Sequence, residues 1–402
     1  MSLPLPPAPD YDGAHLRHVL PSACAALGLE GFANRLDIPP CSIAVVIMVD
    51  GLGDHNLAAH TGHARFLASA WRRAAQGRVL DCGAPATTSA SLTSLGTGKA
   101  PGEHGMLGYD LLAPELGRVV NMLGGWDDDV DPRNWQRHPS VLQQAVDAGA
   151  RVLTASRSQF RDSALTAAAL SGGEFLGADR IESRFRAAQE WIVDGRTAQG
   201  GLRRGPAPAQ LVYLYVDELD KTGHHAGVDS VMWRSMLENL DEAARRLCSA
   251  LTERYGDDVA VLLTADHGML DIAEQELVDI AERDDLLRGV AHTGGDPRML
   301  YLYAEAEQNP VELAARWRAE FGDVAWVLTR DEAIAAGWFG AVEERVLGRL
   351  GDVIIAAHAP IAIFDTARTG VGIMSMVGMH GSLTEVERKI PLLELTGRGF
   401  TG

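Results

Sequence analysis

The stretch SIAVVIMVDGLGD, residues 42–54, joins a continuous apolar run to an acidic, glycine-rich end. A run this rich in β-branched residues is typical of a strand that is buried on both faces of a parallel sheet. Asp50 follows the run directly, so the sequence places a carboxylate at the carboxyl end of this strand. In open α/β sheets that edge is where binding and catalytic sites lie.

Two further apolar runs end in the same way. LVYLYV (211–216) leads into DELDKTGHH (217–225), and DVAVLLTADHG (258–268) ends in an acidic and an imidazole side chain. A later segment, VGMHGS (377–382), carries a histidine between glycines, where the backbone can approach another group closely. Taken singly, such residues are helix caps or surface residues, and a loop of solvated charge is the alternative. Together they suit zinc or another borderline divalent ion. The candidate ligands are Asp50, Asp220, His224, Asp266, His267 and His380.

Predicted strands and helices alternate along the chain, with helices expected over 139–149, 181–194 and 228–255. This alternation favours an α/β layered sandwich with a largely parallel central sheet. The pattern changes between residues 296 and 366, where shorter elements suggest a compact α+β subdomain. We therefore expect a core of residues 1–295 plus 367–402 with a subdomain inserted at 296–366.

The composition is acidic, with 54 Asp and Glu against 36 Lys and Arg and a formal net charge of −18. The sequence has no basic run, so binding to a nucleic-acid backbone is not expected. An anionic substrate would need a local positive centre to overcome this charge. Bound cations would provide that centre.

Sequence features also bear on location. Four scattered cysteines fit no zinc-finger spacing, and the first residues lack the pattern of a secretory signal. No apolar run approaches the roughly 20 residues that span a bilayer. We expect a cytoplasmic protein with free thiols and no membrane contact.

The segment APATTSASLTSLGTGKAPGEHGMLGYD, residues 84–110, is rich in hydroxyl groups and small residues. One of its Ser or Thr residues is expected to cap a helix that begins near Ser91. A hydroxyl at a helix N-terminus beside a metal loses its proton more readily, and the helix end favours a phosphate group. The segment is thus the expected source of a nucleophile.

In this order, VDGLGD, TTSASLTSLGTG, DELDKTGHH, TADHGM and GMHGS resemble the alkaline phosphatase superfamily, and within it the nucleotide pyrophosphatase/phosphodiesterase branch. The resemblance covers roughly residues 40–270 and 370–395, and it implies an alkaline phosphatase-like core. It also implies two divalent metal ions of the zinc type. One would be held by Asp220, His224 and His380, and the other by Asp50, Asp266 and His267. The threonine nucleophile of the branch falls on Thr88, which would also bridge to the second metal; the neighbouring Thr87 remains open.

Two departures from the branch, and two features of other branches that are absent, bear on the substrate. Ser89 stands where the branch has an aromatic residue, and Tyr109 stands where it has an asparagine that contacts the phosphoryl oxygen. Tyr109 either donates to that oxygen or packs. Monoesterases of the superfamily place an arginine after the nucleophile, and its absence here favours diesters. The sulfatase spacing C-x-P-x-R is missing.

The resemblance thus predicts a hydrolase of phosphodiester or pyrophosphate bonds that acts through a phospho-threonine. Its substrate would be a small phosphate ester, with a nucleotide as one candidate, and a homodimer is left open. The alternatives are a phosphomonoesterase or phosphomutase of the same superfamily, and a non-catalytic relative that binds metal or nucleotide. His104 and His225 match no ligand position. Whether His292 and Arg298 contact substrate from the insert is also left open.

Overall fold

The computed structural model describes residues 3–74, 79–124, 126, 128–197 and 208–396. Within this part of the chain, a seven-stranded sheet has the order β2-β17-β8-β1-β7-β5-β6. The strands are β2 (Val79–Asp81), β17 (Lys389–Glu394), β8 (Val259–Ala265), β1 (Ile43–Val49), β7 (Gln210–Val216), β5 (Arg151–Ser156) and β6 (Glu174–Gly177). All neighbours pair in parallel except β17, which is antiparallel to both β2 and β8. The predicted α/β fold with a largely parallel sheet is confirmed.

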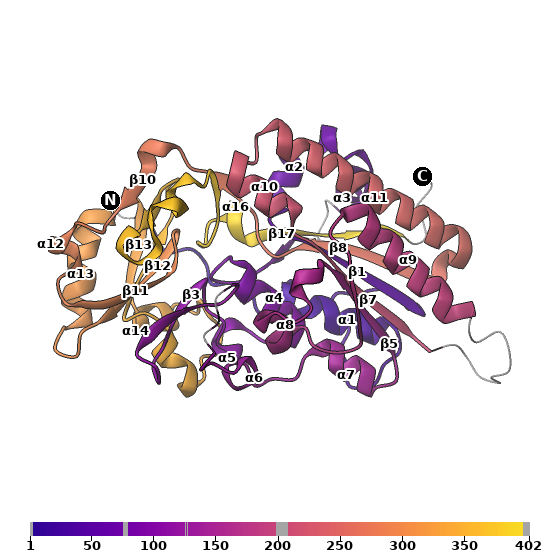
Figure 1. Cartoon of the computed structure of the whole chain (residues 1–402), viewed down its shortest axis with the longest axis horizontal. Coiled ribbons are helices and arrows are strands. Elements are labelled where there is room, and N and C mark those ends of the chain that lie inside the picture. Colours follow the sequence, from indigo (N-terminus) through magenta and orange to yellow (C-terminus); the bar gives the residue numbers. More distant parts are fainter. Residues whose placement is uncertain (1–2, 75–78, 125, 127, 198–207, 397–402) are drawn as a thin grey trace.

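Strand β1 lies at the centre of this sheet, and every residue of β1 and β7 is buried. Helices cover both faces of the sheet (Figure 1). One face carries α3 (Arg65–Ala74), α9 (Ile181–Thr197) and α11 (Val231–Tyr255); the other carries α1 (Val19–Ala26), α4 (Thr88–Thr97), α7 (Val141–Asp147) and α8 (Ala164–Ala169). This two-sided cover explains why the central strands are apolar throughout rather than alternating.

Helix α4 begins at Thr88, earlier than the expected start near Ser91, and Thr87 occupies its N-cap position. A threonine thus stands at the N-cap, as expected, although its side chain makes no hydrogen bond to the helix backbone. The whole helix is buried. Its first residue, Thr88, lies at the carboxyl edge of the sheet, with its hydroxyl 3.5 Å from Asp50 Oδ1.

A second sheet lies at the other end of the molecule (Figure 1). Its order is β13-β14-β12-β11-β3-β4, with β13 (Ala325–Thr329), β14 (Val353–Ala357), β12 (Met299–Ala304), β11 (Val290–Asp296), β3 (Asp110–Ala113) and β4 (Arg118–Asn121). Helix α13 (Pro310–Phe321) covers β13 and β14 and buries Trp317 in a separate apolar core. Strands β3 and β4 come from the segment that follows α4, so the second sheet reaches beyond residues 296–366. That residues 296–366 form a separate inserted subdomain stays a prediction.

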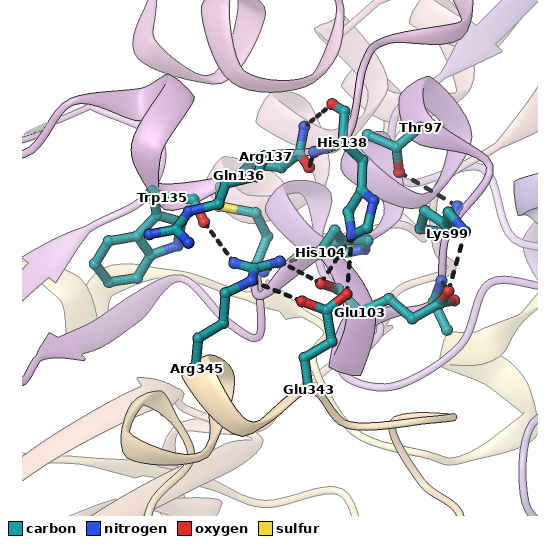
Figure 2. A network of polar contacts seen from close by, with 12 residues as sticks. Thr97, Lys99, Glu103, His104, Trp135, Gln136, Arg137, His138, Glu343 and Arg345 are labelled. Atoms are coloured by element: carbon teal, nitrogen blue, oxygen red, sulfur yellow. Dashed lines mark hydrogen bonds and ion pairs between the residues drawn. The ribbon is translucent and has the colours of Figure 1, made fainter.

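Arg345, near the end of the chain segment that contributes β12–β14, binds the segment that follows α4 (Figure 2). Its guanidinium donates to the carbonyl oxygens of Glu103 at 2.6 Å and Trp135 at 3.0 Å. It also pairs with Glu343, whose other carboxylate oxygen lies 3.3 Å from His138 Nε2. These bonds fix α5 (Pro101–His104) and α6 (Pro132–Trp135) against the 3₁₀ helix η6 (Glu344–Arg349).

In the described part of the chain, no helix has the length and apolar character that a bilayer crossing requires. The cytoplasmic location stays a prediction.

Candidate metal centre and nucleophile

Asp50, Thr88 and His267 meet at the carboxyl edge of the large sheet. Asp50 follows β1 and His267 follows β8, while Thr88 opens α4. Thr88 Oγ1 lies 3.3 Å from His267 Nε2 and 3.5 Å from Asp50 Oδ1, and His267 Nε2 lies 3.3 Å from the same Asp50 oxygen. All three side chains are buried. The structure therefore brings the predicted nucleophile to two of the predicted ligands.

The hydroxyl of the neighbouring Thr87 faces away from Asp50 and His267. Thr87 Oγ1 donates a hydrogen bond of 2.8 Å to Oδ1 of Asp296, the last residue of β11 in the second sheet. Asp296 Oδ2 in turn accepts from the backbone N–H of Tyr109 at 3.2 Å. The Thr87 hydroxyl is thus already engaged, whereas the Thr88 hydroxyl points into the cluster of ligand-type side chains.

Asp266 lies beside this group with one oxygen engaged and one free. Its Oδ1 accepts from the backbone N–H groups of Gly51 and His267 at 3.1 and 3.0 Å. Its Oδ2 has no hydrogen-bond partner among the described residues and lies 3.6 Å from His267 Nε2. Gly51 has φ of +75°, and a Cβ there would come within 3.1 Å of the Asp220 backbone, so only glycine fits this turn.

Asp220, His224 and His380 form the second half of the cluster. Asp220 and His224 are one turn apart on α10 (Glu218–Ala226), and His224 Nε2 lies 3.2 Å from Asp220 Oδ1. His380 Nε2 lies 3.8 Å from the same oxygen. The other ring nitrogens lie 2.7 Å from the Gly378 carbonyl and 2.9 Å from the Ala86 carbonyl. Because a carbonyl only accepts, each Nδ1 carries the proton and each Nε2 is left with its lone pair toward Asp220.

This donor set fits divalent cations. Two groups have ligand atoms within 4.8 Å of one another: Asp50, Asp266 and His267, and Asp220, His267 and His380. Asp220 Oδ1 and Asp266 Oδ2 are buried and have no hydrogen-bond partner in the described chain. Buried carboxylate oxygens normally have partners, and a cation would satisfy both. Mixed carboxylate and imidazole donors are those that zinc takes. His224 belongs to neither close group, although it contacts Asp220.

Burial and the mutual charges of its side chains shift the pKa values of the cluster. Burial, together with the charge of Asp50, raises the pKa of Asp220 and of Asp266 well above the usual value. Burial lowers the pKa of His380, which keeps its imidazole neutral. Burial would also lower the pKa of His267, but the neighbouring carboxylates, Asp266 first, raise it to about 10. Because metal ligands must be deprotonated, a cation bound by these carboxylates would release their protons.

Two pockets open from the cluster and share Thr88, Tyr109, Leu123 and Asp220. The aromatic pocket, of about 270 Å³, is lined by side chains that include Phe160, Phe175, Tyr213 and Tyr215. The methionine pocket, of about 250 Å³, is lined by Leu123, Pro297, Ile373, Met376 and Met379 together with Asp296, His224 and His380. Tyr109 lines both, so it lies where either a phosphoryl contact or packing is possible.

Sequence reasoning missed Tyr215, whose hydroxyl donates to Asp50 Oδ2. Its only signal was its place on the same strand face as Tyr213, one residue before the last residue of β7. The open question about Arg298 is also answered by the structure. Arg298 is buried and forms a two-bond ion pair with Glu387 at 2.7 and 2.9 Å, so it does not contact a substrate. His104 is buried beside Ser94, and His292 lines neither pocket.

Comparison with known families covers the segment that carries these residues. The sequence pattern of the type I phosphodiesterase/nucleotide pyrophosphatase family matches residues 44–383, which is most of the chain and includes every predicted ligand. The chain belongs to this family. The predicted resemblance is therefore confirmed, and the protein is a phosphoric diester hydrolase of a metal-dependent family.

Solved structures share the fold. Murine ectonucleotide pyrophosphatase/phosphodiesterase 5 is 16% identical, with a TM-score of 0.65 and 87% of each chain covered. The same values hold for its inactive threonine-to-alanine variant in complex with AMP. Phosphonoacetate hydrolase from Sinorhizobium meliloti 1021, in complex with phosphonoformate, is 19% identical, with a TM-score of 0.66 and 92% of this chain and 94% of that chain covered.

Proposed function

We propose that the chain hydrolyses phosphodiesters in two steps, with Thr88 as the nucleophile and two zinc-type ions in the cluster. The observation that carries this proposal is the direction of the two threonine hydroxyls. Thr88 Oγ1 faces Asp50 and His267, whereas Thr87 Oγ1 is bonded to Asp296. The inactive murine threonine-to-alanine variant supports a threonine in this role.

In the first step, Thr88 Oγ1 forms a bond to phosphorus and the ester bond to the leaving alcohol breaks. In the second, a water oxygen attacks phosphorus, the bond to Thr88 breaks, and the threonine regains its proton. Asp50, Asp266 and His267 would hold one ion, and Asp220, His224 and His380 the other. Bound ions would lower the pKa of the attacking hydroxyl and neutralise charge on the departing oxygen. The start of α4 adds the positive end of a helix dipole beside the phosphoryl group.

The pockets favour a diester over a monoester. A diester carries two organic arms, and two pockets meet at Thr88. Among the described residues that line them, Lys221 is the only cation, and its ammonium already lies 2.5 Å from Asp217 Oδ2. A doubly charged monoester would therefore find less neutralisation than a singly charged diester.

The aromatic pocket suits an arm with both rings and polar atoms. The hydroxyls of Thr154 and Tyr213 line it and have no hydrogen-bond partner in the described chain. Tyr213 and Tyr215 stack with ring centres 6.4 Å apart. A nucleoside combines a ring with hydrogen-bonding groups, so it is the candidate arm.

The test compares bis(4-nitrophenyl) phosphate with 4-nitrophenyl phosphate in zinc-replete enzyme, and Thr88→Ala with Thr87→Ala. We expect kcat/KM to favour the diester. Thr88→Ala should lower kcat by about 10³-fold or more, because the covalent route is lost. Thr88→Ser should keep measurable activity. A monoester preference would favour a phosphomonoesterase, and an active Thr88→Ala beside an inactive Thr87→Ala would move the nucleophile to Thr87.

A further inference from the structure

The two pockets contact different members of the cluster. The aromatic pocket is lined by Asp50 and Asp220 and by neither His224 nor His380. The methionine pocket is lined by Asp220, His224 and His380 and does not contact Asp50. Thr88 lies where the pockets join, with its hydroxyl turned to Asp50 and His267. The two arms of a diester would therefore lie in different chemical surroundings.

We propose that the methionine pocket binds the leaving group of the phosphodiester, and that this group is an uncharged, apolar alcohol. The inference rests on the proposed function and names its substrate class more closely. It assigns the aromatic pocket to the arm that stays on phosphorus after the first step.

The assignment follows from in-line displacement. The attacking and leaving oxygens lie on opposite sides of phosphorus, so the leaving oxygen departs away from Thr88 Oγ1. The ligand-type side chains that contact Thr88 Oγ1 are Asp50 and His267. His224 and His380 form no hydrogen bond with Thr88 Oγ1 in the described structure, and of the two pockets they line only the methionine pocket. The leaving group therefore departs into that pocket.

Among the described residues, the side chains that line the methionine pocket offer no lysine or arginine to an anionic leaving group, and Asp296 adds a carboxyl group to its wall. The nearby guanidinium groups are already paired, Arg298 with Glu387 and Arg368 with Asp110. A phosphate-bearing leaving group would thus face a carboxyl group without a side-chain counter-charge. An uncharged alcohol meets no such penalty.

The wall of the pocket suits apolar groups of more than one shape. Met379 is buried, while Ile373 and Met376 are partly buried and pack with it in a small apolar cluster. Ile373 belongs to the 3₁₀ helix η7 (Val371–Ser375), and Met376 follows it directly. Methionine side chains are flexible and fill irregular gaps, so this wall can adapt to different apolar alcohols.

The test uses two pairs of synthetic diesters. In the leaving-arm pair, a common phenyl arm is retained and the leaving phenols match in acidity, but one is neutral and the other carries a sulfonate. In the retained-arm pair, the leaving group is 4-nitrophenol and the retained arm is methyl or phenyl. Wild-type enzyme should favour the neutral leaving phenol by about tenfold in kcat/KM, the usual size of a single-pocket preference.

Met376→Lys should reduce or reverse the leaving-arm preference and leave the retained-arm ratio unchanged. The matched variant in the other pocket, Phe175→Leu, should change the retained-arm ratio and not the leaving-arm ratio. Calorimetric binding of the intact diesters to Thr88→Ala protein provides a readout without turnover. Thr88→Ala protein should bind the diester with the neutral leaving phenol more tightly than the sulfonated one. The double variant Thr88→Ala/Met376→Lys should show a smaller difference between these two affinities.

Equal use of the neutral and sulfonated phenols by wild-type enzyme would overturn the inference. So would a Met376→Lys effect on the retained-arm ratio alone, which would exchange the roles of the two pockets. If wild-type enzyme hydrolyses no diester of either pair, the proposed function itself fails, and that result is distinct from the other two.

Discussion

Two adjacent threonines at the start of α4 point in different directions, because Thr87 is the N-cap with extended backbone (φ −142°, ψ 149°) and Thr88 is the first residue of the helix. Thr87 reaches Asp296 in the second sheet, and Thr88 reaches Asp50 and His267 at the edge of the first. The spacing of the family motif favoured Thr88. The sequence could not show that the Thr87 hydroxyl is hydrogen-bonded to Asp296. That partner is more than 200 residues away in the chain, so only the folded structure shows it.

The first prediction at this scale concerns metal content. Wild-type protein purified from zinc-replete medium without chelator should carry about two zinc ions per chain. His224→Ala and His380→Ala should each remove one of them, because both imidazoles direct Nε2 to Asp220 Oδ1. His225→Ala is the control, since that neighbouring side chain is exposed and should leave the zinc content unchanged. Elemental analysis that finds no zinc in the wild-type protein would contradict the metal centre.

The second prediction concerns Asp296 and pH. Burial raises the pKa of Asp296 from 3.8 to about 7, although Thr87 and the Tyr109 N–H donate to it. The folded state therefore holds this proton more tightly than the unfolded state, so the contribution of Asp296 to stability falls as pH rises from about 4 to 7. Denaturant unfolding should show the free energy of unfolding of wild type, minus that of Asp296→Asn, decreasing across this range. If this difference in the free energy of unfolding stays constant or increases with pH, the pKa of Asp296 is not raised in the folded protein.

At the scale of elements, the segment that carries His380 depends on one buried ion pair. Arg298 precedes β12 and binds Glu387 of α16 (Glu385–Arg388), and Glu387 also accepts from the Ser382 N–H at 2.9 Å. The remaining Arg298 donors bind backbone carbonyls, including that of Ile361 at 2.6 Å. The pair thus holds the turn after His380 against the second sheet.

Arg298→Leu should therefore destabilise the protein, because Glu387 would be left as an unpaired buried charge. The expected loss is about 3 kcal/mol in the free energy of unfolding, the usual cost of removing one partner of a buried pair. Bound zinc should also fall, since His380 would lose its fixed position. The exposed pair of Arg283 and Glu320 is the control, and Arg283→Ala should change neither quantity noticeably. An unchanged unfolding midpoint for Arg298→Leu would show that the pair is not needed.

Elements of the site were predictable wherever the signal was local. Apolar runs ending in Asp50, Asp217 and Asp266 predicted the central strands, since burial on both faces requires continuous apolar sequence. The four-residue spacing of Asp220 and His224 predicted one side of a helical turn, and both lie on α10. Tyr215 was not predictable, because a tyrosine inside a buried strand looks like any other core residue.

At the scale of the whole molecule, the second sheet was beyond prediction from local pattern. It joins β3 and β4, which follow α4, to β11 and β12, which come some 170 residues later. Strand pairing over such a distance leaves no periodic signal in the sequence. The pairing has a functional consequence, because it places Asp296 and Pro297 beside Thr88 and so forms one wall of the methionine pocket.

The acidic character of the whole chain also fits the site. With a formal net charge of −18, the protein repels anions except where local positive charge is concentrated. The two cations proposed here would provide that charge next to the start of α4. This balance favours substrates with a single negative charge at phosphorus, as in a diester.

The central claim is that phosphorus is bonded to Thr88 during turnover. The direct measurement is acid quenching during steady-state hydrolysis of bis(4-nitrophenyl) phosphate, followed by peptide mass spectrometry. Wild-type enzyme should yield a peptide whose Thr88 carries the 4-nitrophenyl phosphoryl group, and Thr88→Ala enzyme should yield none. An adduct on Thr87, or turnover without any adduct and with inversion at phosphorus on a chiral diester, would contradict the account.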